Sequence, residues 1–337
     1  MIRDTLEYLG QGLDMTEDHS YKAMNEIMAG DWTSSQIAGF LMGLKLKGET
    51  VNEISGFVRA MRDKATKIQA PDGSVDTCGT GGDGLHSFNV STAAAIVTAA
   101  AGVPVAKHGN RSVSSKSGSA DVLSALGVDI NLTPERAEKC LGEIGIAFLF
   151  APVYHASMKY AVEPRRDMGI RTVFNILGPM SNPAMVDRQI IGAFNYDVAE
   201  KMAKVLQKTG SEHVLVVHSN DGMDELALSS RTTVFELKNG EINIFETSPD
   251  LFGFDYAQIN AIKGGDAQEN AEIMNKVFTG VDSPMTDITA FNAGAAIYVG
   301  GASGSLKDGI ETARAILKEG KAAKKLAQLI DITNANN

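Results

Sequence analysis

The chain has 337 residues, 44% of them hydrophobic and 21% charged, a balance typical of a soluble globular protein. Its 41 acidic residues outnumber 31 basic ones and give a net charge of −10, which argues against nucleic acid or an anionic membrane as a partner of the whole surface. Two cysteines, Cys78 and Cys140, are too few for a disulfide framework, so we expect a reducing, cytoplasmic setting.

The first 66 residues carry helical signals only. Thr33 with Gln36, and Thr50 with Glu53, have the spacing of capping boxes, and apolar residues follow each pair at helical spacing. We therefore predict a small all-helical N-terminal domain over residues 1–66. Its apolar stripes are expected to be covered in part by a second copy of the chain, and they include Phe40, Leu41, Leu44, Phe57 and Met61.

From about residue 75, short apolar strands alternate with helices, which predicts a larger α/β domain over 67–337 with a mostly parallel central sheet. Asn239-Gly240 between two apolar runs predicts an antiparallel hairpin. The longest apolar stretch, 93–106, is interrupted by polar and breaking residues, so it predicts a buried helix and strand and no membrane span. The N-terminus turns acidic at once, so we expect no secretory signal. The predicted strands are 103–106, 146–150, 190–194 and 214–218, and the predicted helices are 91–101, 119–126, one opening at 133–135, and 197–209.

Residues 76–84, Asp-Thr-Cys-Gly-Thr-Gly-Gly-Asp-Gly, combine glycines whose amides can converge on an anion with Asp83, which would repel one. A Mg²⁺ ion would reconcile the two features. A dinucleotide-binding fingerprint is excluded, because no helix opens at the last glycine and no acidic residue stands between Asp83 and Asp121. A Walker A loop is excluded because no Gly-Lys-Ser/Thr follows. A tight glycine turn without a ligand is the alternative.

Three further polar segments could join this loop. Residues 89–92 precede an alanine-rich helix and are expected to direct its positive end at the anion, with Ser91 and Thr92 also acting as ordinary N-caps. Residues 107–112 follow a predicted strand, where parallel sheets gather ligands, and Ser-Ser-Lys-Ser-Gly-Ser at 114–119 predicts a second anion cradle or a bare loop. Asp224 and Glu225 form either a Mg²⁺ site or a solvated turn. No histidine pair has helical zinc spacing, so zinc is excluded.

Two anion cradles and paired carboxylates suit a sugar that carries a phosphate and a diphosphate. Over nearly its whole length the sequence also resembles the anthranilate phosphoribosyltransferases of tryptophan biosynthesis. The departure at Met180-Ser181, where many members carry Leu-Thr, touches nothing catalytic. The segments that carry the resemblance are 38–44, 47–50, 79–83, 89–92, 107–112, 172–183 and 224–225.

The resemblance implies transfer of the phosphoribosyl group from 5-phosphoribosyl 1-diphosphate to the amine of anthranilate, in a cleft between the domains. It also implies a helical return near 165–190, a homodimer formed through the helical part, and Mg²⁺, two ions per subunit. Whether a glutamine amidotransferase associates is not indicated by the sequence.

Each site residue takes its expected role from the same resemblance. Phosphoribosyl diphosphate is expected to contact Gly79, Gly82, Asp83, Ser87, Asn89, Ser91, Thr92, Lys107 and Ser119. The metal ligands are expected to be Ser91, Asp224 and Glu225, and the anthranilate channel is expected to be lined by Gly79, His108, Asn110, His155 and Arg165. Because an aromatic amine is already neutral at pH 7, no strong base is required, and Lys107, Asn110 and Arg165 are expected to act by positioning.

Two other functions fit this architecture. A pyrimidine nucleoside phosphorylase would share the glycine loop but needs no diphosphate metal site, so Asp224-Glu225 counts against it. A non-enzymatic nucleic-acid-binding relative would need a basic face, which a net charge of −10 disfavours.

Overall fold

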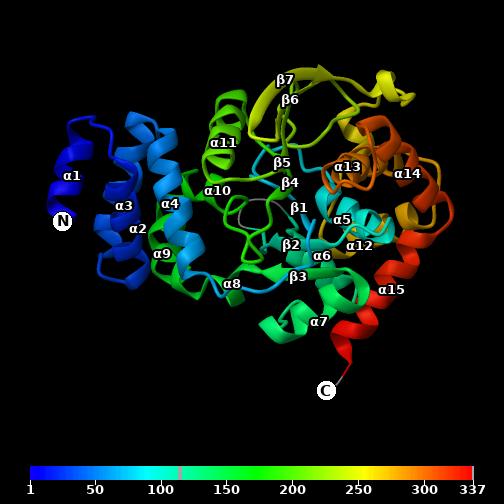
Figure 1. The fold of residues 1–337 in the computed structure, drawn as a ribbon, viewed down its shortest axis with the longest axis horizontal. Coiled ribbons are helices and arrows are strands. Elements are labelled where there is room, and N and C mark those ends of the chain that lie inside the picture. The colour runs from blue at the N-terminus through cyan, green and yellow to red at the C-terminus, as the bar shows by residue number, and fades with distance from the viewer. Residues whose placement is uncertain (113–115, 336–337) are drawn as a thin grey trace.

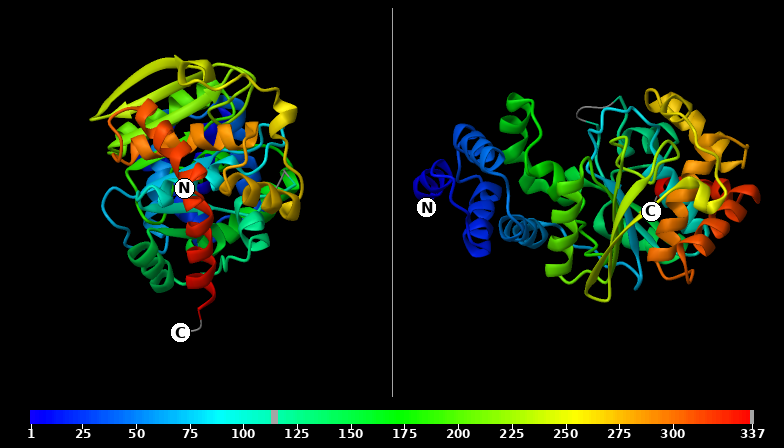
Figure 2. Two further views of the ribbon diagram at one scale, coloured as in Figure 1. Left: turned by 90° about the vertical axis from the view of Figure 1, so that its right-hand side faces the viewer. Right: turned by 90° about the horizontal axis from the view of Figure 1, so that it is seen from above.

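The computed structural model describes residues 1–112 and 116–335. It shows an elongated molecule with a helical bundle at one end of the long axis and an α/β unit at the other (Figures 1 and 2). Thr33 and Thr50 form complete capping boxes at the starts of two bundle helices, as predicted. The bundle comprises α1 (Ile2–Gly10), α2 (Glu17–Ala29), α3 (Ser34–Lys47) and α4 (Val51–Lys64).

Within the described residues, seven strands form one sheet in the order β3-β2-β1-β4-β5-β6-β7. The pairs from β3 through β5 are parallel, whereas β6 and β7 are antiparallel, so the mostly parallel sheet is confirmed. Asn239 and Gly240 both have positive φ, as a tight hairpin turn requires. The strands are β1 (Val75–Gly79), β2 (Val105–Gly109), β3 (Ile146–Phe150), β4 (Arg188–Gly192), β5 (His213–Ser219), β6 (Thr232–Lys238) and β7 (Glu241–Thr247).

Helices cover both faces of this sheet (Figure 1). The alternation of side chains along β5 shows the division: Leu215 and Val217 join the core beneath α5 and α13, while Val214 and Val216 join the core that contains α11 and the bundle. The remaining helices are α5 (Val90–Ala100), α6 (Ser119–Ala125), α7 (Pro134–Ile144), α8 (Ala151–Tyr154), α9 (Lys159–Met168), α10 (Phe174–Leu177), α11 (Tyr196–Lys208), α12 (Ala267–Phe278), α13 (Pro284–Val299), α14 (Leu306–Lys318) and α15 (Lys321–Asn334). None of the helices in the described ranges is long and apolar enough to cross a membrane.

The apolar stripes of the bundle are buried inside the chain itself. Trp32, Phe40 and Phe57 pack edge to face, and the same apolar cluster continues into α11 and one face of the sheet. The expectation that a second copy covers part of these stripes was therefore wrong for its named residues, which are at most 3% exposed: Phe40, Leu41, Leu44, Phe57 and Met61. Because this core is continuous, the division of the chain at residue 66 stays a prediction.

Two elements lie elsewhere than the sequence pattern placed them. The helices that return to the bundle, α9 and α10, occupy 159–168 and 174–177, and β4 already begins at residue 188. Strand β2 extends to Gly109, three residues past the predicted end, because it pairs with β3 along its whole length. Lys107 and His108 are thus strand residues and do not belong to a loop.

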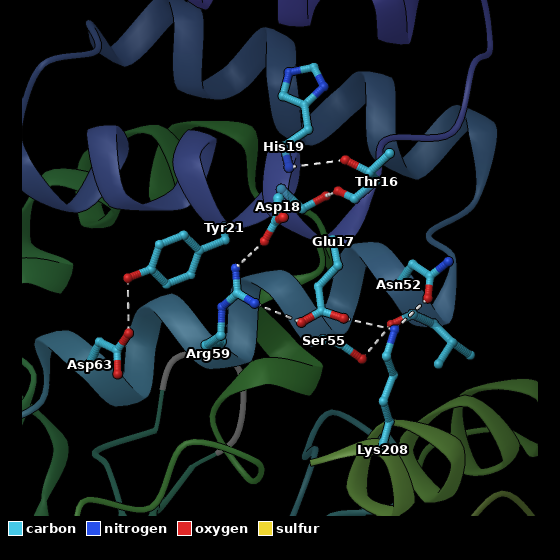
Figure 3. Close-up of polar contacts among 12 residues, drawn as sticks. Thr16, Glu17, Asp18, His19, Tyr21, Asn52, Ser55, Arg59, Asp63 and Lys208 are labelled. Atoms are coloured by element: carbon cyan, nitrogen blue, oxygen red, sulfur yellow. Dashed lines mark hydrogen bonds and ion pairs between the residues drawn. The ribbon is translucent and has the colours of Figure 1, made fainter.

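An exposed network of charges fastens the bundle to α11 (Figure 3). Lys208, at the end of α11, pairs with Glu17 of α2 at 2.7 Å and donates to Asn52 Oδ1 of α4 at 2.6 Å. Arg59 of α4 reaches Glu17 at 3.0 Å and Asp18 at 2.7 Å. Such exposed pairs contribute at most about 1 kcal/mol each, so the shared apolar core is the main attachment.

Candidate functional site

The glycine loop and Asp224 meet at the carboxyl ends of the parallel strands. The chain leaves β1 toward β2 on one side, and β4 lies on its other side, which makes the β1–β4 junction the switch point where such sheets bind ligands. Gly79 and Gly192 are the last residues of these two strands and face each other in register. A Cβ atom on Gly79 would lie 2.6 Å from Asp224 Oδ2, and one on Gly192 would overlap the Asp224 backbone. The two glycines therefore make room for the segment that carries Asp224.

Asp224 is buried and is held by the glycine loop. It is 8% exposed, and its Oδ2 accepts a hydrogen bond from the Gly81 amide at 2.8 Å. Burial, and next the charge of Asp83, raise the pKa of Asp224 to about 6. Burial and the Asp224 charge also raise the pKa of Glu225, against the opposing effect of Lys107. A solvated turn is therefore excluded for Asp224, whereas Glu225 is half-buried.

These carboxylates fit a hydrated cation. Asp83 Oδ1 accepts from the Leu85 amide, while Asp83 Oδ2 is buried without a hydrogen-bond partner. Across residues 1–112 and 116–335, no three His, Cys, Asp or Glu side chains form a ready-made metal cage. Mg²⁺ is usually held by one or two carboxylates together with water and substrate phosphates, and not by a complete cage of protein ligands. The few carboxylates at this position therefore suit Mg²⁺. Ser91, in the first turn of α5, adds a backbone hydrogen bond that lowers the pKa of Glu225.

The glycine loop needs glycine for its backbone conformation. Gly81, Gly82 and Gly84 have φ between 66° and 77°, a region that strains other residues. The Gly81 amide is engaged by Asp224, so not every loop amide can face an anion. The far side of the loop pairs with a distant segment, where Ser87 forms a β-bridge with Lys263.

Arg171 was missed in the sequence analysis. It lies between α9 and α10, and its Nε would be 3.0 Å from a Cβ on Gly82. Its guanidinium also stacks over the Phe194 ring at 4.6 Å, just beyond β4. A cation thus lies against the glycine loop, and the only sequence signal for it was its place directly before the motif segment 172–183.

Lys107 and Asp76 fasten the strands beneath the loop. Lys107 is 3% exposed and donates from Nζ to the Thr77 carbonyl, and burial lowers its pKa. Asp76 is fully buried, which raises its pKa to about 6, with Lys107 opposing the shift. Its carboxylate accepts from Asn182 Nδ2 at 2.8 Å and from the His108 amide at 3.1 Å. Lys107 therefore positions the end of β1.

His108 and His155 form a buried pair with ring centroids 5.1 Å apart. His108 Nδ1 donates to the Gly178 carbonyl at 3.2 Å, and His155 Nε2 donates to the Ser181 carbonyl at 2.9 Å. Their other ring nitrogens are buried without a hydrogen-bond partner. Burial, and next the nearby His155, lower the pKa of His108 to about 3, and burial also lowers the pKa of His155. Both rings are therefore neutral, and each keeps one acceptor nitrogen.

The loop after β2 is organised by Asp121. Its Oδ2 accepts from the amides of Ser112 at 3.1 Å and Gly118 at 2.9 Å, and thereby joins the two ends of the loop. Asn110 is exposed, and its carbonyl accepts from Ser119 Oγ at 3.3 Å. The predicted second cradle rests partly on Ser114 and Ser115, which lie outside the described residues.

The remaining expected site residues are Arg165 and those at the start of α5. Arg165 lies on α9 with its guanidinium 5.1 Å from the Phe174 ring centroid, and burial lowers its pKa. In the described parts of the chain it has no ion-pair partner. Asn89 occupies the N-cap position of α5, but its side chain does not cap that helix. Thr92 Oγ1 is buried without a partner.

Comparison with known proteins places the whole chain in one group. A family model described as "Glycosyl transferase family, helical bundle domain" matches residues 3–65, and "Glycosyl transferase family, a/b domain" matches residues 72–323. An anthranilate phosphoribosyltransferase of Methylobacillus flagellatus is 50% identical over 98% of this chain and 97% of its own.

Solved structures agree with this result. The crystal structure of anthranilate phosphoribosyltransferase from Thermus thermophilus has a TM-score of 0.94 and 39% identity, covering 98% of this chain and all of that one. The Saccharomyces cerevisiae enzyme, solved in complex with PRPP and Mg, has a TM-score of 0.89 and 26% identity, with 98% of each chain covered.

Proposed function

The chain belongs to the anthranilate phosphoribosyltransferase family, and we propose that it transfers the phosphoribosyl group from 5-phosphoribosyl 1-diphosphate to the amine of anthranilate, releasing diphosphate, as a step of tryptophan biosynthesis. The observation that carries this proposal is the group of carboxylates at the switch point beside the glycine loop. Asp224 is buried, Asp83 Oδ2 is buried without a hydrogen-bond partner, and the pKa values of Asp224 and Glu225 are raised. Such a set needs a cation, and a diphosphate is the ligand that would bring one.

The glycine loop and the start of α5 supply the diphosphate side of the site. Gly79, Gly82 and Asp83, with Ser87 to Thr92, lead into the N-terminus of α5, an arrangement that favours anions. Ser119 opens α6 on the facing loop and serves the same ligand. Lys107 acts from beneath by holding the Thr77 carbonyl, and its charge offsets part of the carboxylate repulsion at Glu225.

Asp224, Glu225 and Ser91 would hold Mg²⁺ together with the substrate phosphates, and the ion would supply positive charge that stabilises the leaving diphosphate. The proposal extends to two Mg²⁺ ions per subunit, because the three carboxylates Asp83, Asp224 and Glu225 act on one another electrostatically and more than one cation would relieve their repulsion. The chain's own residues then orient the ribose, whose C1–O bond breaks while the ring passes through an oxocarbenium-like state.

Anthranilate is held by groups on the other wall of the cleft. Arg165 has no ion-pair partner in the described residues and offers a planar fork to the substrate carboxylate. His108 and His155 are neutral and present acceptor nitrogens, which suit an aromatic amine that donates hydrogen bonds. Asn110 lies at the end of β2 beside them. These groups need only hold the amine in line with C1, because it is neutral at pH 7.

The active unit is a homodimer in the cytoplasm. An exposed apolar strip on α3 and the loop between α1 and α2 supports the homodimer. Leu46 and Met42 of α3 are 78% and 42% exposed, and Leu13 of the loop is 42% exposed. The two free cysteines support a reducing compartment. No feature of the described residues supports association with an amidotransferase.

Two parallel reactions with different substrate pairs test the proposal. The purified protein is incubated either with anthranilate and phosphoribosyl diphosphate, or with a pyrimidine nucleoside and inorganic phosphate. Mass spectrometry should detect N-(5-phosphoribosyl)anthranilate and diphosphate in the first mixture and no free base in the second. Release of the pyrimidine base alone would favour a nucleoside phosphorylase instead.

A further inference from the structure

We infer that Asn270, a buried residue of α12 to which the family resemblance gives no role, is a positioning residue for the phosphoribosyl diphosphate site. It joins the two phosphate-binding loops through a chain of hydrogen bonds, and the inference rests on the proposed function. Asn270 is 2% exposed and follows the glycine loop by almost 190 positions in sequence. Sequence spacing therefore gave no hint of this contact.

The chain of hydrogen bonds crosses three distant segments. The Gly265 amide donates to Asn270 Oδ1 at 2.8 Å, and Asn270 Nδ2 donates to Asn89 Oδ1 at 2.9 Å. Asn89 Nδ2 then donates to the Ser117 carbonyl at 3.2 Å. The first backbone group can only donate and the last can only accept, so both ends fix the orientation of the two side-chain amides.

This chain explains why Asn89 does not cap α5. Both polar atoms of its side chain are engaged by Asn270 and by the loop after β2, so Asn89 links the entrance of α5 to Ser117. The same distant segment also holds the glycine loop through its backbone, because the Gly264 amide donates to the His86 carbonyl at 2.9 Å. The two phosphate-binding loops and the segment around Gly264 thus keep their spacing through the side-chain amides of Asn270 and Asn89.

The conservative change Asn270→Asp breaks one link of the chain. The carboxylate still accepts from Gly265, but it cannot donate to Asn89 Oδ1, so two oxygen atoms face each other. Asn275→Asp is the matched control, because it makes the same chemical change at an exposed position of the same helix. Gly264→Ala is a second variant, since its new methyl group would overlap Asn270 Oδ1 and the Phe88 backbone and so displace both the amide and the end of the glycine loop.

Binding of phosphoribosyl diphosphate with Mg²⁺ is measured by calorimetry, together with both Michaelis constants and the melting temperature. We expect N270D and G264A to weaken phosphoribosyl diphosphate binding about tenfold, the value of one lost hydrogen bond. The KM of N270D and G264A for anthranilate should stay within about twofold of the wild type, and so should the affinity of N275D for phosphoribosyl diphosphate. A twofold change is smaller than the effect of one lost hydrogen bond.

Three outcomes would overturn the inference. N270D could bind phosphoribosyl diphosphate like the wild type, or it could lose both substrates equally as its melting temperature falls, which would mark a structural role. If the wild type itself bound no phosphoribosyl diphosphate, both the proposed function and the inference would fail. If the wild type and N270D bound it equally well, only the inference would fail.

Discussion

Replacing Gly192 by alanine tests whether the close approach of Asp224 to the ends of β1 and β4 builds the site. The φ of Gly192 is not in the left-handed region, so alanine adds no backbone strain and acts only through its Cβ. That atom would overlap the Asp224 carbonyl and lie 3.0 Å from Asp224 Cβ. A backbone carbonyl cannot rotate aside, so the whole segment must shift.

The expected cost follows from two contributions. Overpacking a tight contact costs about 1–3 kcal/mol, and losing the hydrogen bond between Gly81 and Asp224 adds about 1 kcal/mol. We therefore expect Gly192→Ala to lower the free energy of unfolding in urea by roughly 2–4 kcal/mol and to raise the Mg²⁺ concentration needed for activity.

Gly142→Ala is the matched control. Gly142 lies in α7 on the surface with no atom near the position of an added Cβ, so alanine there should raise stability by up to about 1 kcal/mol. The reasoning is refuted if Gly192→Ala unfolds within about 0.5 kcal/mol of the wild type, the spread of neutral surface changes, and keeps its Mg²⁺ dependence.

Four further changes have distinct expected outcomes. Asp224→Asn combined with Glu225→Gln should weaken the Mg²⁺ dependence of activity while the protein stays folded, because it removes the mutually repelling carboxylates. Arg165→Ala should raise the KM for anthranilate roughly ten- to a hundredfold, the effect of one charge-assisted contact, and change the KM for phosphoribosyl diphosphate far less. Leu46→Glu should give a folded, active monomer in sedimentation, because Leu46 is 78% exposed on the strip assigned to the dimer. The folded-state pKa of Asp76, raised from 3.8 to about 6, means that its protonated form favours the fold. Relative to Asp76→Asn, the wild type should therefore lose about 3 kcal/mol of unfolding free energy as pH rises from about 4 to 6.

The outcomes that would contradict these predictions are equally specific. An unchanged Mg²⁺ titration in the folded double variant rejects the carboxylate assignment, and equal effects on both KM values remove Arg165 from the anthranilate wall. A wild type that sediments as a monomer at micromolar concentration contradicts the dimer. If the stability curves of Asp76→Asn and the wild type run parallel over this pH range, the pKa of Asp76 does not differ between the folded and unfolded states.

Local signals predicted the elements that depend on neighbouring residues. The capping boxes at Thr33 and Thr50 and the turn at Asn239-Gly240 each involve groups within a few positions, and each formed as expected. The glycine motif located the glycine loop, and the carboxyl end of the predicted strand 214–218 located Asp224, because parallel strands bring those ends together.

Features that depend on tertiary contact were not predictable from spacing. Gly192 matters because it stands opposite Gly79 in register, and Arg171 because α9 returns beside the loop. Lys107 looked like a loop residue, but pairing with β3 placed it in a strand. The bundle stripes looked incomplete because α11, which covers them, comes more than 130 residues later in the chain.

The most direct test of the account is the fluorescence of anthranilate on mixing with the protein, phosphoribosyl diphosphate and Mg²⁺. We expect the fluorescence to fall as product forms, only when all three are present, and to fall far more slowly with the Asp224→Asn, Glu225→Gln variant. Undiminished fluorescence with the folded wild-type protein would contradict the proposed transfer, and an equal decay without Mg²⁺ would contradict the role given to the carboxylates.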